Sequence, residues 1–143
     1  MISGDGQVYA THPVPTMTKV DLLYKCWKTE YSLPNHKLKV YDYYYDTFKS
    51  VVIKDIVRTG VRPVYNVTLE NGKSLKCSHD TLFLTKDGFY EFEEDMEVGT
   101  IALVSCCDKP KYSKIVSIER VGEKETFKID TSENYIVNGI IIK

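Results

Sequence analysis

The pair Asn71-Gly72 lies between two short runs of residues that favour β-strands, Val64–Leu69 and Ser74–Cys77. Both residues of the pair tolerate a positive φ, so Asn-Gly between two such runs is a strong signal for a tight β-hairpin. Asp87-Gly88 gives the same signal between Leu82–Leu84 and Phe89–Phe92. Further candidate strands follow at short intervals, at Leu38–Tyr45, Ser50–Val57, Ile101–Ser105, Ile115–Val121, Thr126–Asp130 and Tyr135–Lys143. This spacing predicts an antiparallel, strongly bent, mostly β fold.

The segment Thr18–Lys28 departs from the β pattern and predicts one short early helix. Thr18 is the expected N-cap, and Asp21 three positions later completes a capping box with Asp in place of the more common Glu. Apolar and aromatic side chains recur on one helical face, at Val20, Leu23, Tyr24 and Trp27. We expect this face to pack against the core of a single domain that spans residues 1–143.

Composition narrows the choice of partners. The chain has 143 residues and a formal charge of -1, and 43% of its residues are hydrophobic. We therefore expect a soluble domain whose partners include neither nucleic acid nor a membrane. No apolar run of membrane length and no signal peptide is visible, which predicts a cytoplasmic location. The four cysteines, Cys26, Cys77, Cys106 and Cys107, form no C-x-x-C motif, so we expect reduced thiols and no metal.

Three segments, in order along the chain, carry recognisable motifs. The first is Ile2-Ser3-Gly4-Asp5-Gly6-Gln7-Val8, and the second runs from Gly72 to Thr85 with Ser78-His79-Asp80-Thr81 at its centre. The third, Glu133–Lys143, has Asn138-Gly139 followed by three isoleucines. Together they resemble the N-terminal, second and C-terminal splicing motifs of inteins, and the resemblance extends over most of the chain.

The resemblance implies the horseshoe-like, pseudo-twofold antiparallel β fold of the Hint superfamily and an autocatalytic protein-splicing function. In that chemistry a nucleophile at residue 1 attacks the preceding carbonyl, and the acyl group then moves to the downstream flanking segment. A terminal Asn finally cyclises and releases the domain, so that the flanking extein segments become ligated. The exteins are the partners, no cofactor is required, and each molecule reacts once, unlike a turnover enzyme.

The resemblance also assigns candidate site residues, several of which depart from the family pattern. Met1 stands at the position of the nucleophile, and its thioether has no proton to lose. Lys143 aligns with the penultimate histidine, and the expected terminal Asn is absent. Ser78 replaces the usual Thr of the second motif, and Thr81 stands where the usual His would be. The chain as given is therefore expected to be inactive.

Supporting positions follow from the same alignment. Lys128 occupies a late-strand position that is often Asp in the family, and Asp5 and Asn134 are further candidates inside the terminal motifs. We expect His79 to replace the missing histidine, because imidazole can move a proton near neutral pH and threonine cannot. If the backbone is extended there, residues 79 and 81 point to the same face and Asp80 points away.

The chain length and Met17 indicate which kind of intein this chain resembles. A chain of this size leaves no room for an inserted homing endonuclease, so the resemblance is to a mini-intein. Met17 follows the turn-prone stretch His12-Pro13-Val14-Pro15-Thr16 and is a plausible translation start. We therefore expect a split intein that divides near 16/17 and splices in trans, with the complementary fragment as a further partner.

Two other classes of protein remain open at this point. One is a Hint-type autoprocessing domain that cleaves without ligation. The Asn-Gly-Ile-Ile-Ile ending favours an intein over such a domain. The other is a β-rich peptide-binding module without chemistry, which would explain Met1 but not three ordered motifs.

Overall fold

The computed structural model describes residues 1–12, 15–29, 36–91, 97–106, 109–131 and 133–143. Its elements in chain order are β1 (Ile2–Ser3), β2 (Gln7–His12), β3 (Thr16–Lys19), α1 (Val20–Thr29), β4 (Lys37–Asp42), β5 (Thr47–Val52), β6 (Asp55–Leu69), β7 (Ser74–Cys77), β8 (Leu82–Thr85), β9 (Gly88–Glu91), β10 (Ile101–Cys106), β11 (Lys109–Asp130), β12 (Tyr135–Val137) and β13 (Ile140–Ile142). The predicted mostly β, horseshoe-like fold with one early helix is confirmed.

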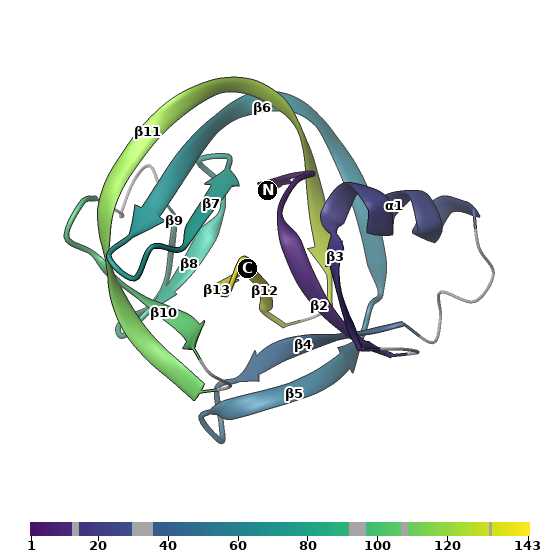
Figure 1. The fold of residues 1–143 in the computed structure, drawn as a ribbon, viewed down its shortest axis with the longest axis horizontal. Helices are drawn as coiled ribbons and strands as arrows, with labels where there is room; N and C mark the ends of the chain where they lie inside the picture. The colour runs from purple at the N-terminus through teal and green to yellow at the C-terminus, as the bar shows by residue number, and fades with distance from the viewer. Residues whose placement is uncertain (13–14, 30–35, 92–96, 107–108, 132) are drawn as a thin grey trace.

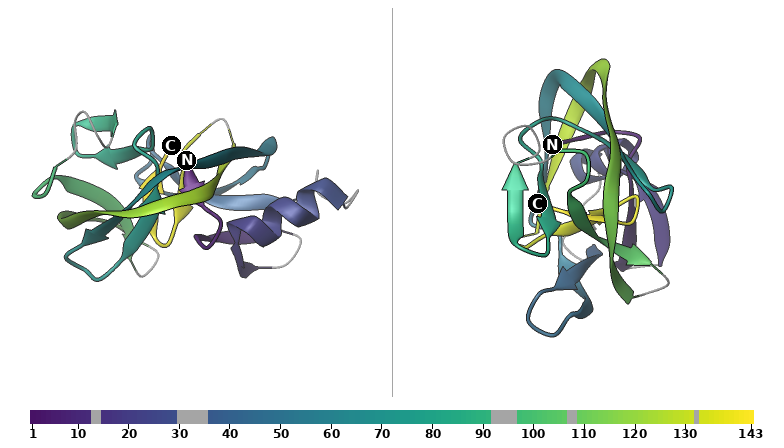
Figure 2. Two further views of the ribbon diagram at one scale, coloured as in Figure 1. Left: turned by 90° about the horizontal axis from the view of Figure 1, so that it is seen from above. Right: turned by 90° about the vertical axis from the view of Figure 1, so that its left-hand side faces the viewer.

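Two sheets make up the domain. The larger has the strand order β1-β7-β6-β11-β10-β13-β8-β9, with β12 paired to β13, and the smaller has the order β3-β2-β4-β5. Extra pairings of β1 with β11 and of β8 with β10 draw the larger sheet into a strongly curved surface. The C-terminal hairpin of β12 and β13 lies in the middle of the molecule, and both chain ends lie near that centre (Figure 1; Figure 2).

The long arch of β6 and β11 differs from the predicted strands. Ile115–Val121 and Thr126–Asp130 were expected as separate strands, but both belong to the single strand β11 (Figure 1). Register shifts along the β6–β11 pair, one of them between Arg120 and Gly122, let the strand bend without breaking. Gly122 has a φ of 109°, so the position that resembles a turn in the sequence is a bulge.

The hairpin of β4 and β5 also corrects the predicted bounds. Residues 43–46 form a turn, so Leu38–Tyr45 ends early as a strand. The Asp42 carboxylate accepts hydrogen bonds from the backbone nitrogens of Tyr44 and Tyr45, at 2.9 and 3.3 Å. This local acceptor favours a turn over continued sheet pairing. The predicted strand Ser50–Val57 is divided between β5 and β6.

The helix begins two residues later than predicted. Thr18 is not its N-cap but lies in β3, paired with Val8 of β2. The first helical N–H groups, those of Val20 and Asp21, donate to the carbonyls of Gly6 and Gly4 at 2.8 and 3.0 Å. These donors therefore have backbone partners and need no side-chain cap. Val20 and Leu23 are buried, as expected, and the side chain of Trp27 lies outside the described part of the chain.

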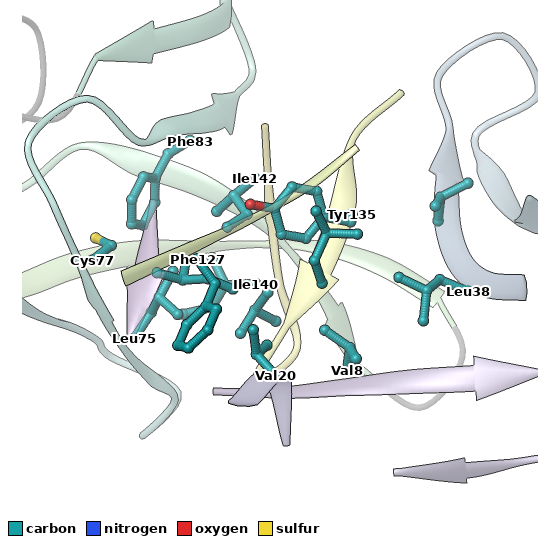
Figure 3. Packing of buried hydrophobic residues seen from close by; sticks show 14 of the residues in the cluster. Val8, Val20, Leu38, Leu75, Cys77, Phe83, Phe127, Tyr135, Ile140 and Ile142 are labelled. Atoms are coloured by element: carbon teal, nitrogen blue, oxygen red, sulfur yellow. The ribbon is translucent and has the colours of Figure 1, made fainter. Parts of the chain in front are cut away.

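The core surrounds the C-terminal hairpin. Ile140, Ile141 and Ile142 have no exposed surface, because β13 is covered on both faces. Side chains from the early strands, the helix and the long arch gather around it (Figure 3). Asn138-Gly139 forms a turn, with φ of 51° and 79° at the two positions, so the predicted strand Tyr135–Lys143 is divided into β12 and β13. The last residues of the chain are therefore held rigidly from within the core.

Candidate functional site

The first residue is fixed in place by the short strand β1. Ile2 pairs with Cys77 at the end of β7 and with Phe127 of β11, and its side chain has no exposed surface. Met1 therefore lies beside the end of β7 and the start of the segment Ser78–Thr81. A fully buried neighbour gives residue 1 little freedom to move.

Two hydroxyl side chains hold the backbone of Met1. Its carbonyl oxygen accepts hydrogen bonds from the backbone nitrogen of Ser78 at 2.8 Å, from Ser78 Oγ at 3.3 Å and from Thr81 Oγ1 at 2.9 Å. Its amine nitrogen donates to Thr81 Oγ1 at 2.6 Å. Ser78 and Thr81 are buried. The structure thus brings three of the predicted site residues, Met1, Ser78 and Thr81, into direct contact.

Asp80 lies against the same nitrogen, contrary to the expectation that it points away. Its Oδ1 is 3.4 Å from the Met1 amine and also accepts a hydrogen bond from Ser78 Oγ. Its Oδ2 is 3.6 Å from Nη1 of Arg62 on β6. Burial alone would raise the pKa of Asp80. The Ser78 hydrogen bond, the charged amine and Arg62 outweigh burial and hold this pKa below its ordinary value.

His79 does not occupy the predicted position. Residues 79 and 80 form a turn, and the His79 side chain is exposed. The expectation of an extended backbone, which would have placed residues 79 and 81 on one face, is therefore wrong. The turn forms because Ser78 and Asp80 hydrogen-bond across it, a local pairing that competes with strand geometry.

The C-terminal end of the chain also lies beside the segment Ser78–Thr81. Lys143 and Leu82 exchange backbone hydrogen bonds of 2.8 and 3.1 Å, directly after Thr81. Met1 and Lys143 both line one pocket of about 290 Å³. The Lys143 ammonium leans over the Phe89 ring, 5.6 Å from its centroid. The two ends of the chain therefore meet at one pocket.

The three supporting candidates lie in different surroundings. Lys128 is exposed and lines the pocket that holds both chain ends. Asp5 is away from that pocket, where its carboxylate accepts a hydrogen bond from Ser3 and lies 3.0 Å from Nζ of Lys76. Asn134 is buried and binds the backbone of Tyr41, with two hydrogen bonds of 2.8 Å. Of these three candidates, Lys128 is the one that lies in the same pocket as Met1 and Lys143.

Sequence reasoning missed Asp80 and Arg62 as members of the site. Asp80 was placed in the second motif but expected to point away from the site, and Arg62 was not singled out. The Ser-x-Asp spacing of Ser78 and Asp80 was the available signal, because short polar side chains two residues apart commonly bond across a turn. The contact of Asp80 with Met1 has no local signal, since it joins residues 79 positions apart.

Within the described segments, no group of three or more His, Cys, Asp or Glu residues could hold a metal ion. Among the same residues, no helix is long and apolar enough to cross a membrane.

Cys77 is expected to be chemically inert in the folded chain. Cys26, Cys77 and Cys106 are free thiols, and Cys107 lies outside the described residues. Cys77 has no exposed surface, and burial raises the pKa of its thiol to about 12. The thiolate, which is the reactive form, is therefore scarce at neutral pH. In iodoacetamide labelling followed by peptide mass mapping, Cys77 should stay unmodified until denaturant is added, while half-buried Cys26 reacts first. Equal labelling of both in the native chain would contradict the described packing.

A mostly β domain whose two ends meet beside one hydroxyl-bearing turn is a Hint-type fold. Within that class the chain has the fold of inteins, as solved structures show. A DnaB intein from Synechocystis sp. PCC 6803 superposes with a TM-score of 0.84 at 21% identity, covering 99% of this chain and 95% of that one. The transcription factor IIB Mvu mini-intein gives 0.81 at 14% identity, with coverages of 99% and 97%. A DnaX mini intein from Spirulina platensis gives 0.76 at 16% identity, with coverages of 99% and 97%. No protein-family model matches the sequence, and no curated protein matches it either.

Proposed function

We propose that this chain is a protein-splicing domain that excises itself and joins the segments on either side. The observation that carries the proposal is the shared pocket, which is lined by both the first residue, Met1, and the last, Lys143. Acyl transfer between two flanking segments requires both reacting ends at one place, within about 3–3.5 Å in the reactive geometry. A domain that only binds peptides has no need for this arrangement.

The contacts at residue 1 suit the first step of splicing. In a precursor, the nitrogen of residue 1 is the amide nitrogen of the bond that must break. Thr81 Oγ1, at 2.6 Å, accepts a hydrogen bond from this nitrogen, and Ser78 and Thr81 together fix the carbonyl that follows it. Such contacts hold the backbone beside the scissile bond in one position, as a reaction between oriented groups requires. With Met1 the step cannot begin, because a thioether supplies no nucleophilic thiolate or alkoxide.

A variant that carries the reacting groups of splicing tests the proposal. The variant carries Met1→Cys, an added Asn after Lys143, a downstream segment beginning with Cys, and a different flanking protein at each end. A ligated product of the two flanking proteins on a gel, confirmed by mass spectrometry, is expected. Cleavage without ligation would assign the chain to autoprocessing domains instead. No reaction in a folded variant would leave a peptide-binding module as the better interpretation.

The structure also supports a natural division near 16/17. A fragment of residues 1–16 would contribute β1, which lies between β7 and β11, and β2, which lies between β3 and β4. Ile2, Val8 and Ala10 from this fragment are buried in the core. Asn138 adds a specific contact, since it exchanges hydrogen bonds of 2.8 and 2.9 Å with the backbone of Gln7. The fragment would dock by strand addition, in which backbone hydrogen bonds supply affinity.

Separately made fragments 1–16 and 17–143 are expected to associate at micromolar concentration. The fragment carries Asp5 and no Lys or Arg, and its ion pairs with the other fragment, Asp5–Lys76 and Met1 amine–Asp80, are both partly exposed. Such pairs contribute about 1 kcal/mol or less, so raising the salt concentration should change Kd by less than about threefold. Ile2→Ala should weaken binding by at least about tenfold, because removing a buried isoleucine costs roughly 2–5 kcal/mol.

Gln7→Ala is the matched control, since the Gln7 side chain is exposed and its contacts with Asn138 use only the backbone. Isothermal titration calorimetry measures both variants. Absence of association at micromolar concentration, or equal losses for the two variants, would argue against docking by burial of β1.

A further inference from the structure

We infer that Asp80, positioned by Arg62 and Ser78, moves the proton at the scissile nitrogen in place of the histidine that this motif lacks. The inference rests on the proposed splicing function and concerns only its first step. Thr81 stands at the histidine position, and a threonine hydroxyl is too weakly acidic and basic to hold a proton near neutral pH. An ionisable group is nevertheless present on the same turn.

The Asp80 carboxylate is held by contacts on both oxygens. Oδ1 lies 3.4 Å from the nitrogen of Met1 and accepts the Ser78 hydroxyl, while Oδ2 faces Arg62 at 3.6 Å. Arg62 is itself fixed, because its Nε donates to the carbonyl of Thr59 at 3.3 Å. The carboxylate therefore presents one oxygen to the scissile nitrogen and cannot easily rotate away. A group that acts in proton transfer must be near the atom it serves, either directly or through one intervening molecule.

The proton balance of the step closes within the molecule. In a chain with Cys at residue 1, Asp80 accepts the proton of the thiol, and the sulfur attacks the carbonyl carbon of the preceding residue. The carbon–sulfur bond forms and the carbon–nitrogen bond breaks. Asp80 then returns the proton to the departing nitrogen, which leaves as a neutral amine. The carboxylate ends as it began, and no further reactant is needed.

Arg62 is a positioning residue, because it touches Asp80 and not the reacting atoms. Its charge favours the ionised carboxylate, the form that can accept a proton. Asp80 and the pocket beside it are surrounded by further titratable groups, namely the Met1 amine, Cys77, Lys128, Asp130, Glu133, Tyr135 and Lys143. In a precursor the Met1 amine is replaced by a neutral amide, so Arg62 and Ser78 become the remaining contacts that hold Asp80 ionised.

The test uses the full chain with Met1→Cys, an N-terminal flanking protein and no terminal Asn, so that only the first step occurs. Hydroxylamine traps the thioester, at a concentration beyond which the rate no longer rises. Asp80→Asn should slow release of the flanking hydroxamate at least about tenfold near pH 7. This figure is below the usual contribution of a general acid–base group because water can partly replace the carboxylate. Circular dichroism shows whether each variant is folded.

A pH profile separates proton transfer from mere structural support. Without Asp80 the reaction depends on the free thiolate, whose fraction rises about tenfold per pH unit below a thiol pKa near 8.5. The rate of Asp80→Asn should therefore rise steeply between about pH 5 and 7, while the parent profile stays shallow. Arg62→Ala should move the acidic fall in rate to higher pH by about 0.5 or more, and Arg62→Lys should restore the parent profile.

Arg58→Ala is the matched control for Arg62. Arg58 lies on the same strand, β6, and pairs at 3.1 Å with Glu125, and 59% of its side-chain surface is exposed. Its removal should leave the profile unchanged. The role of Asp80 would be overturned, and the proposed function left standing, by the following result. The parent reacts, the rate of Asp80→Asn is within threefold of the parent rate, and the pH profile of Asp80→Asn is as shallow as that of the parent. If Asp80→Asn fails to fold, identical profiles for Arg62→Ala and Arg58→Ala would overturn that role instead. A parent that yields no hydroxamate would overturn the proposed function itself.

Discussion

Replacing Thr81 with valine is expected to slow the first splicing step by about 10²-fold in the chain that carries Cys at residue 1. One hydroxyl oxygen contacts both the nitrogen and the carbonyl oxygen of residue 1, at 2.6 and 2.9 Å, so valine removes both contacts at once. A misplacement of about 1 Å at a reacting bond can cost a factor of this size. Hydroxylamine-trapped release of the N-terminal flanking protein measures the rate.

Two companion variants make the result specific to the hydroxyl at residue 81. Thr81→Ser keeps the oxygen and should recover at least about a third of the parent rate, because the same hydrogen bonds can form. Thr85→Val is the matched control, since Thr85, the last residue of β8, is also buried, and its hydroxyl bonds to the backbone of Gly88 and Asp87. Thr85→Val should lower the melting temperature but leave the rate of release of the N-terminal flanking protein close to that of the parent. A Thr81→Val chain that is folded and reacts at the parent rate would remove Thr81 from the mechanism.

His79→Ala in the same assay decides between two assignments of the proton-moving group. Its exposed place on the turn predicts a rate within about threefold of the parent, well below the usual contribution of an acid–base group. A loss of tenfold or more, with intact circular dichroism, would return the role to the histidine and count against Asp80.

Local chemistry explains why several turns were predictable from the sequence. Asn138-Gly139 adopts positive φ at both residues, which few other pairs tolerate, so the C-terminal hairpin follows from two residues alone. Gly88 likewise has a positive φ between β8 and β9. The buried isoleucines that follow Gly139 were predictable in the same way, because an uninterrupted apolar run indicates a strand covered on both faces.

Long-range pairing explains where prediction from the sequence failed. β11 continues through Gly122 because β6 beside it provides a partner along the whole arch, and a sequence window around Gly122 contains no sign of β6. Thr18 has the composition of an N-cap, but pairing with Val8 keeps it in a strand. Local propensity was overridden by tertiary contacts in both cases.

In the candidate site, too, some features were predictable from the local sequence and others depend on distant parts of the chain. Met1, Ser78, Thr81 and Lys143 were named from motifs. In the structure Met1 and Lys143 line one pocket, and Ser78 and Thr81 contact the backbone of Met1. The direction of Asp80 was not predictable, because it depends on the Met1 nitrogen and on Arg62, which come from distant parts of the chain. The motif specifies which residue types occur on the turn, and the packing of β1 and β6 against that turn specifies which of them faces residue 1.

The stability of the central hairpin is expected to depend strongly on Asn134. Its side chain binds both backbone groups of Tyr41, accepting from the nitrogen and donating to the carbonyl oxygen, each at 2.8 Å. Both residues are buried, so water cannot easily replace the amide. Asn134→Ala leaves a buried donor and a buried acceptor unpaired, at a cost of about 1–3 kcal/mol each. The free energy of unfolding should therefore fall by about 2–6 kcal/mol.

Urea unfolding followed by circular dichroism measures this loss, and the melting temperature should fall by about 3 °C for each kcal/mol. Asn71→Ala is the matched control, because the exposed Asn71 side chain accepts one hydrogen bond, from the nitrogen of Lys73 at 3.0 Å within a turn. Since water can satisfy an exposed nitrogen, that change should cost less than about 1 kcal/mol. Equal losses for the two variants would mean that the bond between Asn134 and β4 does not hold the C-terminal hairpin in place. The position of Lys143 beside Met1 would then depend on the packing of β13 alone.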